Sequence, residues 1–246
     1  MTHAEPRTPR ERRHDESARR ILDEAMRMVE QGGLEALSMN RLAEAVHYTP
    51  GALYRYFASK DALLAQLVVR ILEDVRVTLA AALAALPPRA TPLARVLALA
   101  LGYRSFARRE PQRFGLLAMT MAEPRVLIDQ PAAEPVVTLM LAVMQPLGAA
   151  LTAAAQARLL GPGDSAERTI LVFALLQGVL PLHKQTRYAP RLLDVDHLLA
   201  RGLRALLMGW GASARAVDTA TRQLASVTDA DADADAEKPP RTGAAS

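Results

Sequence analysis

The amino-acid sequence predicts an all-α protein, and three observations support this fold class. Ala, Leu and Arg dominate the chain, whereas aromatic residues make up only 4% of it. Apolar residues recur at the spacing of a helix face, and no segment shows the alternation of a strand. Half of the 246 residues are hydrophobic, which supplies enough apolar surface for a sizeable core.

Composition excludes several classes of site and protein. The chain has no cysteine, which excludes disulfides and thiolate metal sites, and its five histidines show no metal-ligand spacing. The N-terminal segment lacks the apolar core of a secretory signal. We expect Arg, Glu, Gly or Pro to interrupt every apolar stretch before it reaches membrane-spanning length. A soluble, cytoplasmic protein without a metal or other cofactor is therefore expected.

The chain begins with a basic segment, although its net charge of +4 is too small to require a nucleic-acid partner. Residues 1–15 are interpreted as a flexible arm, and a helix is expected from Ser17 to the glycine pair 32–33. The arm either is simply disordered or contacts a DNA minor groove or phosphates. The candidates for such contacts are Arg10, Arg12 and Arg13.

Capping residues mark the next three helices. Ser38 is a good N-cap for a short helix over residues 39–46. The Thr49-Pro50 pair begins a second short helix, since proline at the first helical position loses no hydrogen bond. Ser59 caps a third helix, which is long and carries a continuous apolar stripe until Pro87-Pro88 stops it.

The rest of the chain is predicted to be a series of helices separated by prolines and by the caps Asp164 and Asp194. Two prolines, Pro135 and Pro146, predict a kink or a break in one of them. Residues 216–246 include an acidic run of low complexity and are expected to be disordered. The expected helices span residues 92–110, 111–123, 131–160, 165–188 and 195–210.

The segment from Ser38 to Leu64 carries the functional information. Two short helices joined by a very short turn can cross only where the contact residue is small, and Ala43 stands at that point. This is the spacing of a helix-turn-helix, whose second helix enters the DNA major groove. Hydroxyl and cationic side chains, which phosphate oxygens require, are interleaved here. They are Arg41, Tyr48, Thr49, Tyr54, Arg55, Tyr56 and Lys60.

This segment also resembles the signature of the tetracycline-repressor (TetR) family. Thr-Pro-Gly-Ala-Leu-Tyr-Arg-Tyr-Phe begins at Thr49 and is followed by Lys60-Asp61 and Leu63-Leu64. The resemblance covers about residues 17–70. It implies phosphate contacts by Thr49, Tyr54, Tyr56 and Lys60. It also implies phosphate or base contacts by Ser38, Asn40 and Arg41, and base-facing positions for Pro50, Gly51 and Ala52.

The chain departs from the family pattern at the turn between the two helices. The family usually has Gly-Val there, whereas this chain has His47-Tyr48. A residue with a side chain is strained where the turn requires a positive φ, although His tolerates this better than most. His47 and Tyr48 are candidates for a contact of their own.

The predicted organisation has three parts: a helix-turn-helix DNA-binding domain over 1–60, a helical ligand-binding and dimerisation domain over 61–215, and the tail, 216–246. The resemblance implies a cytoplasmic, nucleoid-associated repressor. Such a protein binds an inverted-repeat operator in double-stranded DNA and is released by a small, largely apolar effector. Candidate residues for an effector pocket are Tyr103, Phe106, Phe114, Met119, Phe173 and His183.

Pairing of two chains is predicted from small residues on the last two long helices. Helices with small residues among large apolar ones can pack closely, so two from each chain form a four-helix bundle. A homodimer, with no membrane partner, is therefore expected. The small residues are Ala174, Gly178, Gly202, Ala205 and Gly209.

Alternative interpretations remain for several of these features. Ordinary core is the default interpretation of Phe106, Phe114, Met119 and Met121, and a partly buried structural histidine is that of His183. An architectural DNA-binding protein that senses no effector would share the N-terminal features. An enzyme is not supported, because the chain has no G-x-S-x-G, H-E-x-x-H, P-loop or dinucleotide-binding pattern, and no catalytic residue is assigned.

Overall fold

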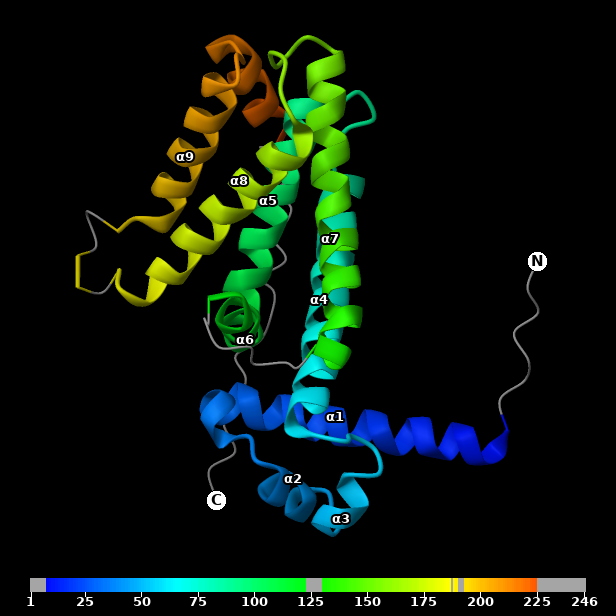
Figure 1. The fold of residues 1–246 in the computed structure, drawn as a ribbon. Coiled ribbons are helices and arrows are strands. Elements are labelled where there is room, and N and C mark those ends of the chain that lie inside the picture. The colour runs from blue at the N-terminus through cyan, green and yellow to red at the C-terminus, as the bar shows by residue number, and fades with distance from the viewer. Residues whose placement is uncertain (1–7, 123–129, 187, 190–192, 225–246) are drawn as a thin grey trace. The chain divides into compact units, whose positions relative to one another are not determined.

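The computed structural model describes residues 8–122, 130–186, 188–189 and 193–224. Every regular element in these ranges is helical, which confirms the predicted fold class (Figure 1). A helix without a label follows the last labelled one, over residues 214–224. The labelled elements are α1 (Pro9–Ala36), α2 (Met39–Ala45), α3 (Pro50–Leu53), α4 (Lys60–Ala84), α5 (Pro92–Arg109), α6 (Pro111–Ala122), α7 (Gln130–Gln156), α8 (Ser165–Val179), the 3-10 helix η1 (Leu180–Lys184) and α9 (Val195–Gly209).

The chain forms two compact units, each built from two separate stretches of sequence. The first unit contains Met1–Arg76 and Phe106–Val143, and the second contains Val77–Ser105 and Met144–Ser246. Helices α1, α2, α3 and α6 belong to the first unit, and α8, η1 and α9 belong to the second. The first unit thus includes α6, which the sequence analysis assigned to the larger domain, because α6 packs against α1.

The core of the first unit explains the crossing of its short helices. Helix α1 packs against α2, and α2 against α3, with α1 drawn above both in Figure 1. Leu42 and Ala43 on α2 and Leu53 on α3 are all fully buried. The small side chain of Ala43 therefore lies inside the packed helix-turn-helix, where the spacing places it. Helix α3 has only four residues, because the chain leaves it for a turn at Tyr54.

Helix α1 begins earlier than the sequence analysis expects. Thr8 is its N-cap, and the Thr8 backbone N–H donates to Glu11 Oε2 at 2.7 Å. The Glu11 N–H donates in turn to the Thr8 hydroxyl at 3.3 Å, which completes a capping box. The expectation of a flexible arm up to residue 15 is therefore wrong from Pro9 onward. These first helical turns carry exposed Arg10, Arg12 and Arg13.

The glycine pair predicted to end α1 does break it. Gly33 has φ 70° and ψ −176°, which no helical residue adopts, and one further turn follows to Ala36. A side chain is rarely tolerated at a positive φ of this size, so glycine suits the position. Leu37, buried directly after the break, leads the chain into the Ser38 cap of α2.

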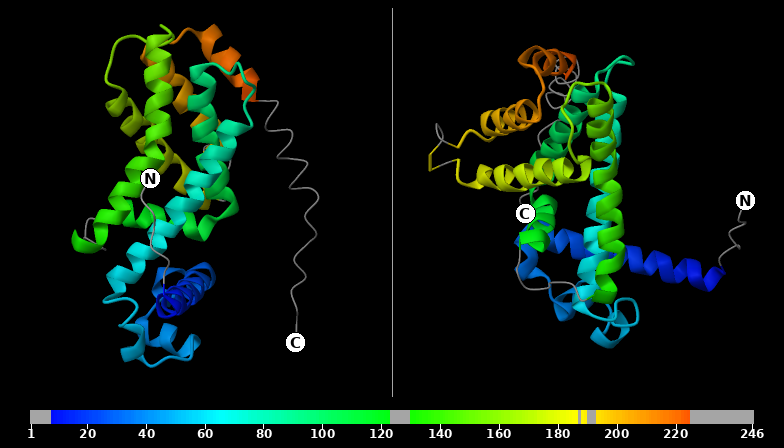
Figure 2. Two further views of the ribbon diagram at one scale, coloured as in Figure 1. Left: turned by 90° about the vertical axis from the view of Figure 1, so that its right-hand side faces the viewer. Right: turned by 45° about the horizontal axis from the view of Figure 1, so that its top comes forward.

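Helices α8 and α9 pack side by side in the second unit (Figure 2). Gly202 on α9 permits this approach, because a Cβ at that position would lie 2.7 Å from Leu175 Cδ1 on α8. Both helices have the predicted caps. Asp164 Oδ1 accepts from the Ala166 N–H at 2.8 Å, and Asp194 Oδ1 accepts from the His197 N–H at 3.0 Å.

A buried arginine holds the loop before α8. Arg168 is only 5% exposed, and its Nη2 donates to the carbonyl oxygens of Gly161 and Pro162 at 2.9 and 3.0 Å. Its guanidinium also lies over the Trp210 ring, 5.4 Å from the centroid, which adds a cation–π attraction. The Gly161 N–H donates to the Trp210 carbonyl at 2.7 Å, so the loop and the end of α9 are held together.

Three expectations about helix ends and breaks are corrected by the structure. Helix α7 runs unbroken past Pro146, and α8 ends at Val179, where η1 replaces it. The helix over 214–224 extends into the segment expected to be disordered. It is ordered there because it buries three apolar side chains, those of Val217, Ala220 and Leu224.

Two helical stretches are long and apolar enough, by length and composition alone, to cross a membrane. They are Ala133–Gln156 and Ser165–Lys184, with 22% and 28% of their most apolar windows buried inside the structure. The expectation that every apolar stretch is interrupted too early is therefore wrong for these two. The core helix of a soluble protein and a signal sequence meet the same criteria, so one or two such helices are weak evidence for a membrane.

Candidate nucleic-acid interface

The candidate interface is built on two capped helices in the first unit. Ser38 Oγ accepts a hydrogen bond from the Arg41 N–H at 3.2 Å, and Thr49 Oγ1 accepts from the Ala52 N–H at 3.2 Å. Each cap satisfies a backbone N–H that would otherwise lack a partner in the first turn. Pro50 occupies the first position of α3, as the sequence predicts. Helix α3 therefore begins at a fixed point after a short turn.

The turn between α2 and α3 has the strained residue that its sequence predicts. His47 has φ 59°, in the left-handed region that favours glycine. Backbone hydrogen bonds hold it there, because the His47 N–H donates to Glu44 O at 3.1 Å and the Tyr48 N–H to Ala43 O at 2.8 Å. The tight turn is thus kept although histidine replaces glycine.

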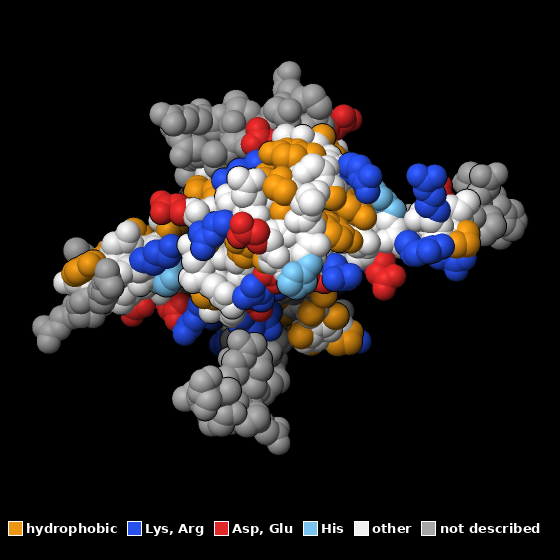
Figure 3. All heavy atoms as spheres, turned by 90° about the horizontal axis from the view of Figure 1, so that it is seen from below, with side chains coloured by type: hydrophobic (Ala, Val, Ile, Leu, Met, Phe, Trp, Pro, Cys, Tyr) orange, Lys and Arg blue, Asp and Glu red, His pale blue; other side chains and the backbone are white. Residues whose placement is uncertain are grey.

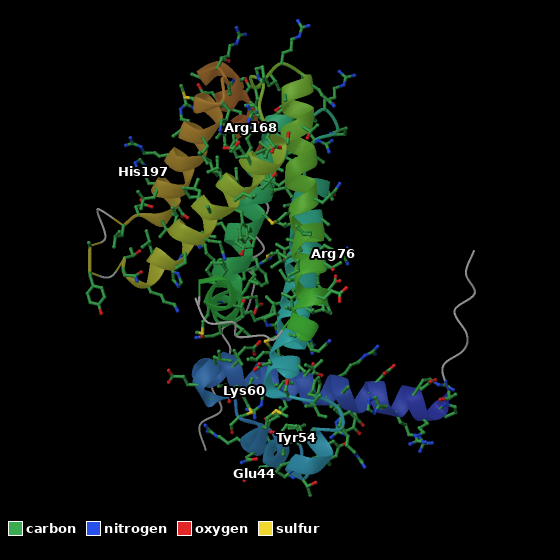
Figure 4. The ribbon with its side chains drawn as sticks, viewed as in Figure 1. Glu44, Tyr54, Lys60, Arg76, Arg168 and His197 are labelled. Atoms are coloured by element: carbon green, nitrogen blue, oxygen red, sulfur yellow. The ribbon has the colours of Figure 1, made fainter. Side chains whose placement is uncertain are left out.

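Most of the ten predicted contact residues are exposed, and all lie between the start of α2 and the start of α4. Ser38, Ala52 and Tyr56 are half-buried, and the other seven are exposed. A Cβ at Gly51 would meet no atom within 4 Å, so the surface beside α3 is open. Figure 4 labels Tyr54 and Lys60 in this region, together with Glu44 on α2. The exposed seven are Asn40, Arg41, Thr49, Pro50, Gly51, Tyr54 and Lys60.

Basic side chains surround this region unevenly. Viewed from below, Lys and Arg side chains lie at separate places among hydrophobic ones, and several gather at the right-hand end (Figure 3). The first turns of α1 lie at that end, with exposed Arg10, Arg12 and Arg13. A cationic helix end beside a helix-turn-helix suits a phosphate backbone.

A stack of three aromatic rings was missed by sequence reasoning. The His14 ring on α1 stacks on Tyr56, with centroids 4.6 Å apart and planes at 16°. Tyr56 stacks in turn on Tyr48, at 5.9 Å and 11°. Hydrogen bonds from Ser17 and Tyr56, with the charge of Arg20, lower the pKa of Tyr48 against the opposing effect of burial. Two sequence signals could have indicated that His14 lies on a helix, although not what it contacts: the Thr8 capping box, and the three-residue spacing of His14, Ser17 and Arg20.

The six candidate effector residues divide between the two units. In the first unit, Phe106 and Phe114 are buried, whereas Met119 is 43% exposed. In the second, Tyr103 is buried, its hydroxyl lies 3.1 Å from Gln177 Oε1, and its ring meets the edge of Phe173 at 6.1 Å. His183 is exposed, and its Nδ1 lies 3.0 Å from the Leu180 carbonyl. Within each unit the buried aromatic residues pack inside the structure, whereas Met119 and His183 are exposed.

Comparison with known families gives two matches. Residues 21–67 match the model described as bacterial regulatory proteins of the tetR family. Residues 96–206 match the model of a tetracyclin repressor-like C-terminal domain. The first match contains the caps, the turn and α3, and the second begins within α5 and extends into α9.

Individual relatives agree with these matches. The chain is 40% identical over 60 residues to the HTH-type transcriptional repressor KstR of Rhodococcus jostii, which is 24% of this chain and 28% of that protein. The chain thus matches less than a third of this curated relative's length. A protein of unknown function from Rhodococcus sp. RHA1 has a TM-score of 0.65 at 25% identity, covering 79% of this chain and 95% of the other.

A further solved structure is similar in fold. AibR, solved in complex with isovaleryl coenzyme A and operator DNA, has a TM-score of 0.56 at 21% identity. The similarity covers 78% of this chain and 98% of AibR. The two family models together span the helix-turn-helix and most of the helices that follow it. The chain is therefore a member of the TetR family of bacterial regulatory proteins, a DNA-binding regulator with an N-terminal helix-turn-helix.

Proposed function

We propose that this protein is a transcriptional repressor that binds an inverted-repeat operator as a homodimer and leaves it when a small, largely apolar effector binds. The observation that carries the proposal is the open face of α3. Pro50 and Gly51 are exposed behind the Thr49 cap, with Tyr54 and Lys60 exposed nearby. Small residues let the backbone approach bases closely, while hydroxyl groups and a lysine meet phosphates.

The capping hydroxyls remain able to contact DNA. Ser38 Oγ and Thr49 Oγ1 each accept one backbone N–H, and each still carries a proton that it can donate to a phosphate oxygen. We assign phosphate contacts to Thr49, Tyr54, Tyr56 and Lys60, and phosphate or base contacts to Ser38, Asn40 and Arg41. Pro50, Gly51 and Ala52 face the bases, where they can touch thymine methyl groups but form no bidentate hydrogen bonds.

Exposed apolar residues on α8 and α9 support pairing of two chains. Ile170 on α8 is 61% exposed and Met208 on α9 is 43% exposed, which is unfavourable in water unless another surface covers them. Four of the five predicted small residues are exposed as well, whereas Gly202 contacts Leu175 within the chain. We therefore place the dimer contact on the face with Ala174, Gly178, Ala205 and Gly209.

This contact also accounts for the apolar composition of α8. A helix that pairs with a second chain needs an apolar exposed face just as a membrane helix does. A regulator that acts on an operator works in the cytoplasm, associated with the nucleoid. Two DNA-binding domains related by a two-fold axis recognise an inverted repeat, because each domain reads one half-site.

Release by an effector requires a difference in affinity between two states of the protein. The effector must bind the DNA-incompetent state more tightly, because a ligand that is indifferent to the two states shifts nothing. A preference of about 2–3 kcal/mol lowers operator affinity roughly thirty- to hundredfold. AibR, of the same fold, is solved with both an acyl coenzyme A and operator DNA. The buried side chain of Tyr103 and the half-buried ring of Phe173, which meet within the second unit, are candidates for apolar contacts with such a ligand.

The experiment begins with selection of DNA from a random pool by the purified full-length chain. An enriched site with dyad symmetry is expected, and sedimentation should show a dimer. Small apolar compounds that raise the melting temperature are then tested for release of that site. No enriched site would overturn the proposed DNA regulation. Stabilising compounds that never alter operator affinity would instead favour an architectural DNA-binding protein.

A further inference from the structure

We propose that His14 and Ser17 on α1 are positioning residues of the DNA interface, which set the orientation of Tyr56 and Tyr48 for contact with the phosphate backbone. The inference rests on the DNA-binding function proposed above. It adds residues of α1 to an interface that otherwise extends from the start of α2 to the start of α4. Neither residue belongs to the family signature that carries the resemblance. The proposal depends on the position of α1 beside the residues that follow α3, where Tyr56 lies.

The geometry stacks Tyr56 against two other rings. His14 covers one face of Tyr56 with centroids 4.6 Å apart, and Tyr48 lies against it with centroids 5.9 Å apart. The three planes are nearly parallel, at 16° and 11° to one another. A ring that stacks on two neighbours cannot rotate about χ1 without breaking a stack. The Tyr56 hydroxyl therefore has one favoured direction before DNA arrives.

A second residue of the same helix acts on the Tyr48 hydroxyl. Ser17 is the main cause of the lowered pKa of Tyr48, followed by Tyr56, and the charge of Arg20 on the next turn of α1 lowers it further. His14, Ser17 and Arg20 recur every three residues, so they lie along one face of α1. This face runs past the end of α3 and approaches both tyrosines.

The support is a rigid helix rather than a mobile arm. The Thr8–Glu11 capping box fixes the start of α1 less than two turns before His14. Without that cap the first turns of a helix fray, and His14 would leave Tyr56. Ordering a side chain in the free protein removes an entropic loss that binding would otherwise incur. The stack therefore raises affinity without necessarily touching DNA.

The test compares four variants of the full-length chain on the selected operator at pH 8, where an ordinary histidine is neutral. His14→Ala and Ser17→Ala should each weaken binding about three- to tenfold, the range that ordering one side chain supplies. His14→Phe keeps a ring on Tyr56 and should restore most of the affinity. His197→Ala, at an exposed histidine on α9, is the matched control and should bind like the unaltered chain. Melting temperatures confirm that each variant folds.

Two further measurements separate positioning from direct contact. If His14 acts through Tyr56, the effects of His14→Ala and Tyr56→Phe are not additive in a double-mutant cycle. At pH 6, where an ordinary histidine is mostly protonated, the salt dependence of binding should stay the same in His14→Phe. A lower salt slope and no recovery in His14→Phe would show a direct cationic contact with phosphate and overturn the positioning role.

The proposed function and this inference fail in different ways. If the unaltered chain and His197→Ala bind no operator, DNA regulation is wrong and the inference falls with it. If both bind and folded His14→Ala binds equally well, the positioning role alone is wrong.

Discussion

Arg113 on α6 donates a hydrogen bond from Nε to Glu30 Oε1 on α1 at 2.8 Å. Its Nη1 donates to Asp74 Oδ2 on α4 at 3.0 Å, and Glu110 Oε2 lies 3.7 Å from its Nε. Burial alone would lower the pKa of Arg113, but the hydrogen bond to Glu30 and the charges of Glu110, Glu30 and Asp74 raise it overall. One side chain thus connects three helices of the first unit.

Removal of this connection should destabilise the first unit. Arg113→Ala should lower the free energy of unfolding by about 1–2 kcal/mol, because partly buried carboxylates lose a charged donor. Arg76→Ala is the control, since it removes an exposed pair with Glu73 on the same helix and should change stability by less than about 0.5 kcal/mol. Chemical denaturation measures both. Equal effects would mean that Arg113 stabilises no more than a surface ion pair does.

The phosphate contacts predict a distinct salt dependence. Lys60→Ala should weaken binding to all DNA sequences alike and reduce the salt slope by about one ion. Tyr56→Phe should also weaken all sequences alike but leave the slope unchanged, because tyrosine is neutral. Lys184→Ala, an exposed lysine on η1, is the matched control. Fluorescence anisotropy across salt concentrations tests this, and an unchanged slope in Lys60→Ala would contradict the assigned contact.

The strained turn predicts a stabilising substitution. His47→Gly should raise the free energy of unfolding by about 1 kcal/mol, because relief of strain at φ 59° exceeds the entropy that glycine adds to the unfolded chain. Glu44→Gly, on the exposed side of α2, is the control and should lower stability by about 1 kcal/mol. Thermal denaturation distinguishes them. A less stable His47→Gly would show that the histidine side chain makes a favourable contact.

The proposed pairing surface predicts loss of the dimer on charge insertion. Ile170→Arg should give a folded monomer at concentrations where the unaltered chain is dimeric, since the charge would be buried without a partner. Operator affinity should fall when the dimer is lost, because a single DNA-binding domain reads only a half-site. Ala81→Arg, at an exposed position on α4, is the control. Sedimentation velocity reports the result, and an unchanged dimer would exclude this face of α8.

Burial of Tyr103 predicts an alkaline loss of stability. Its side chain is 4% exposed, and burial raises the pKa of its hydroxyl above the ordinary value of about 10. The folded state keeps the Tyr103 proton to a higher pH than the unfolded chain does. The stability that the protonated hydroxyl provides is therefore complete below about pH 10 and is lost as pH rises further. Tyr103→Phe should therefore flatten the decline of stability above pH 10. It should also lose about 1 kcal/mol at neutral pH with the hydrogen bond to Gln177.

Urea unfolding between neutral and alkaline pH measures both effects of Tyr103→Phe. Tyr54→Phe is the control, because Tyr54 is 48% exposed and lies outside the buried core that surrounds Tyr103. A parallel decline in all three proteins would assign the alkaline loss to other groups.

Local signals in the sequence predicted most of the fold and the main interface. The caps Ser38, Thr49, Asp164 and Asp194 lie where they were expected, because capping depends on near neighbours in the chain. The capping box at Thr8 was equally local, but it was overlooked because a run of arginines suggested disorder. Periodicity could not distinguish buried Phe114 from exposed Met119, since both belong to apolar helical patterns.

Contacts between distant parts of the sequence had no such signal. The stack of His14 on Tyr56 depends on the angle at which α1 crosses the helix-turn-helix, and no short-range pattern specifies that angle. The bonds from Arg113 to Glu30 and Asp74 depend on α6 returning to α1. Such relationships follow from tertiary packing rather than from residue type.

The close approach at Gly202 separates packing within one chain from pairing between two chains, two requirements that often conflict in oligomeric proteins. Contact with Leu175 keeps α8 and α9 together within one chain, while the face with Ala174 and Gly178 is left free. Substitutions on that free face can alter partner choice without disturbing the fold of the subunit. If the gene were duplicated, a few substitutions on α8 of one copy could therefore change its dimerisation specificity. Each of the two resulting regulators would then pair only with itself, and they would no longer exchange subunits.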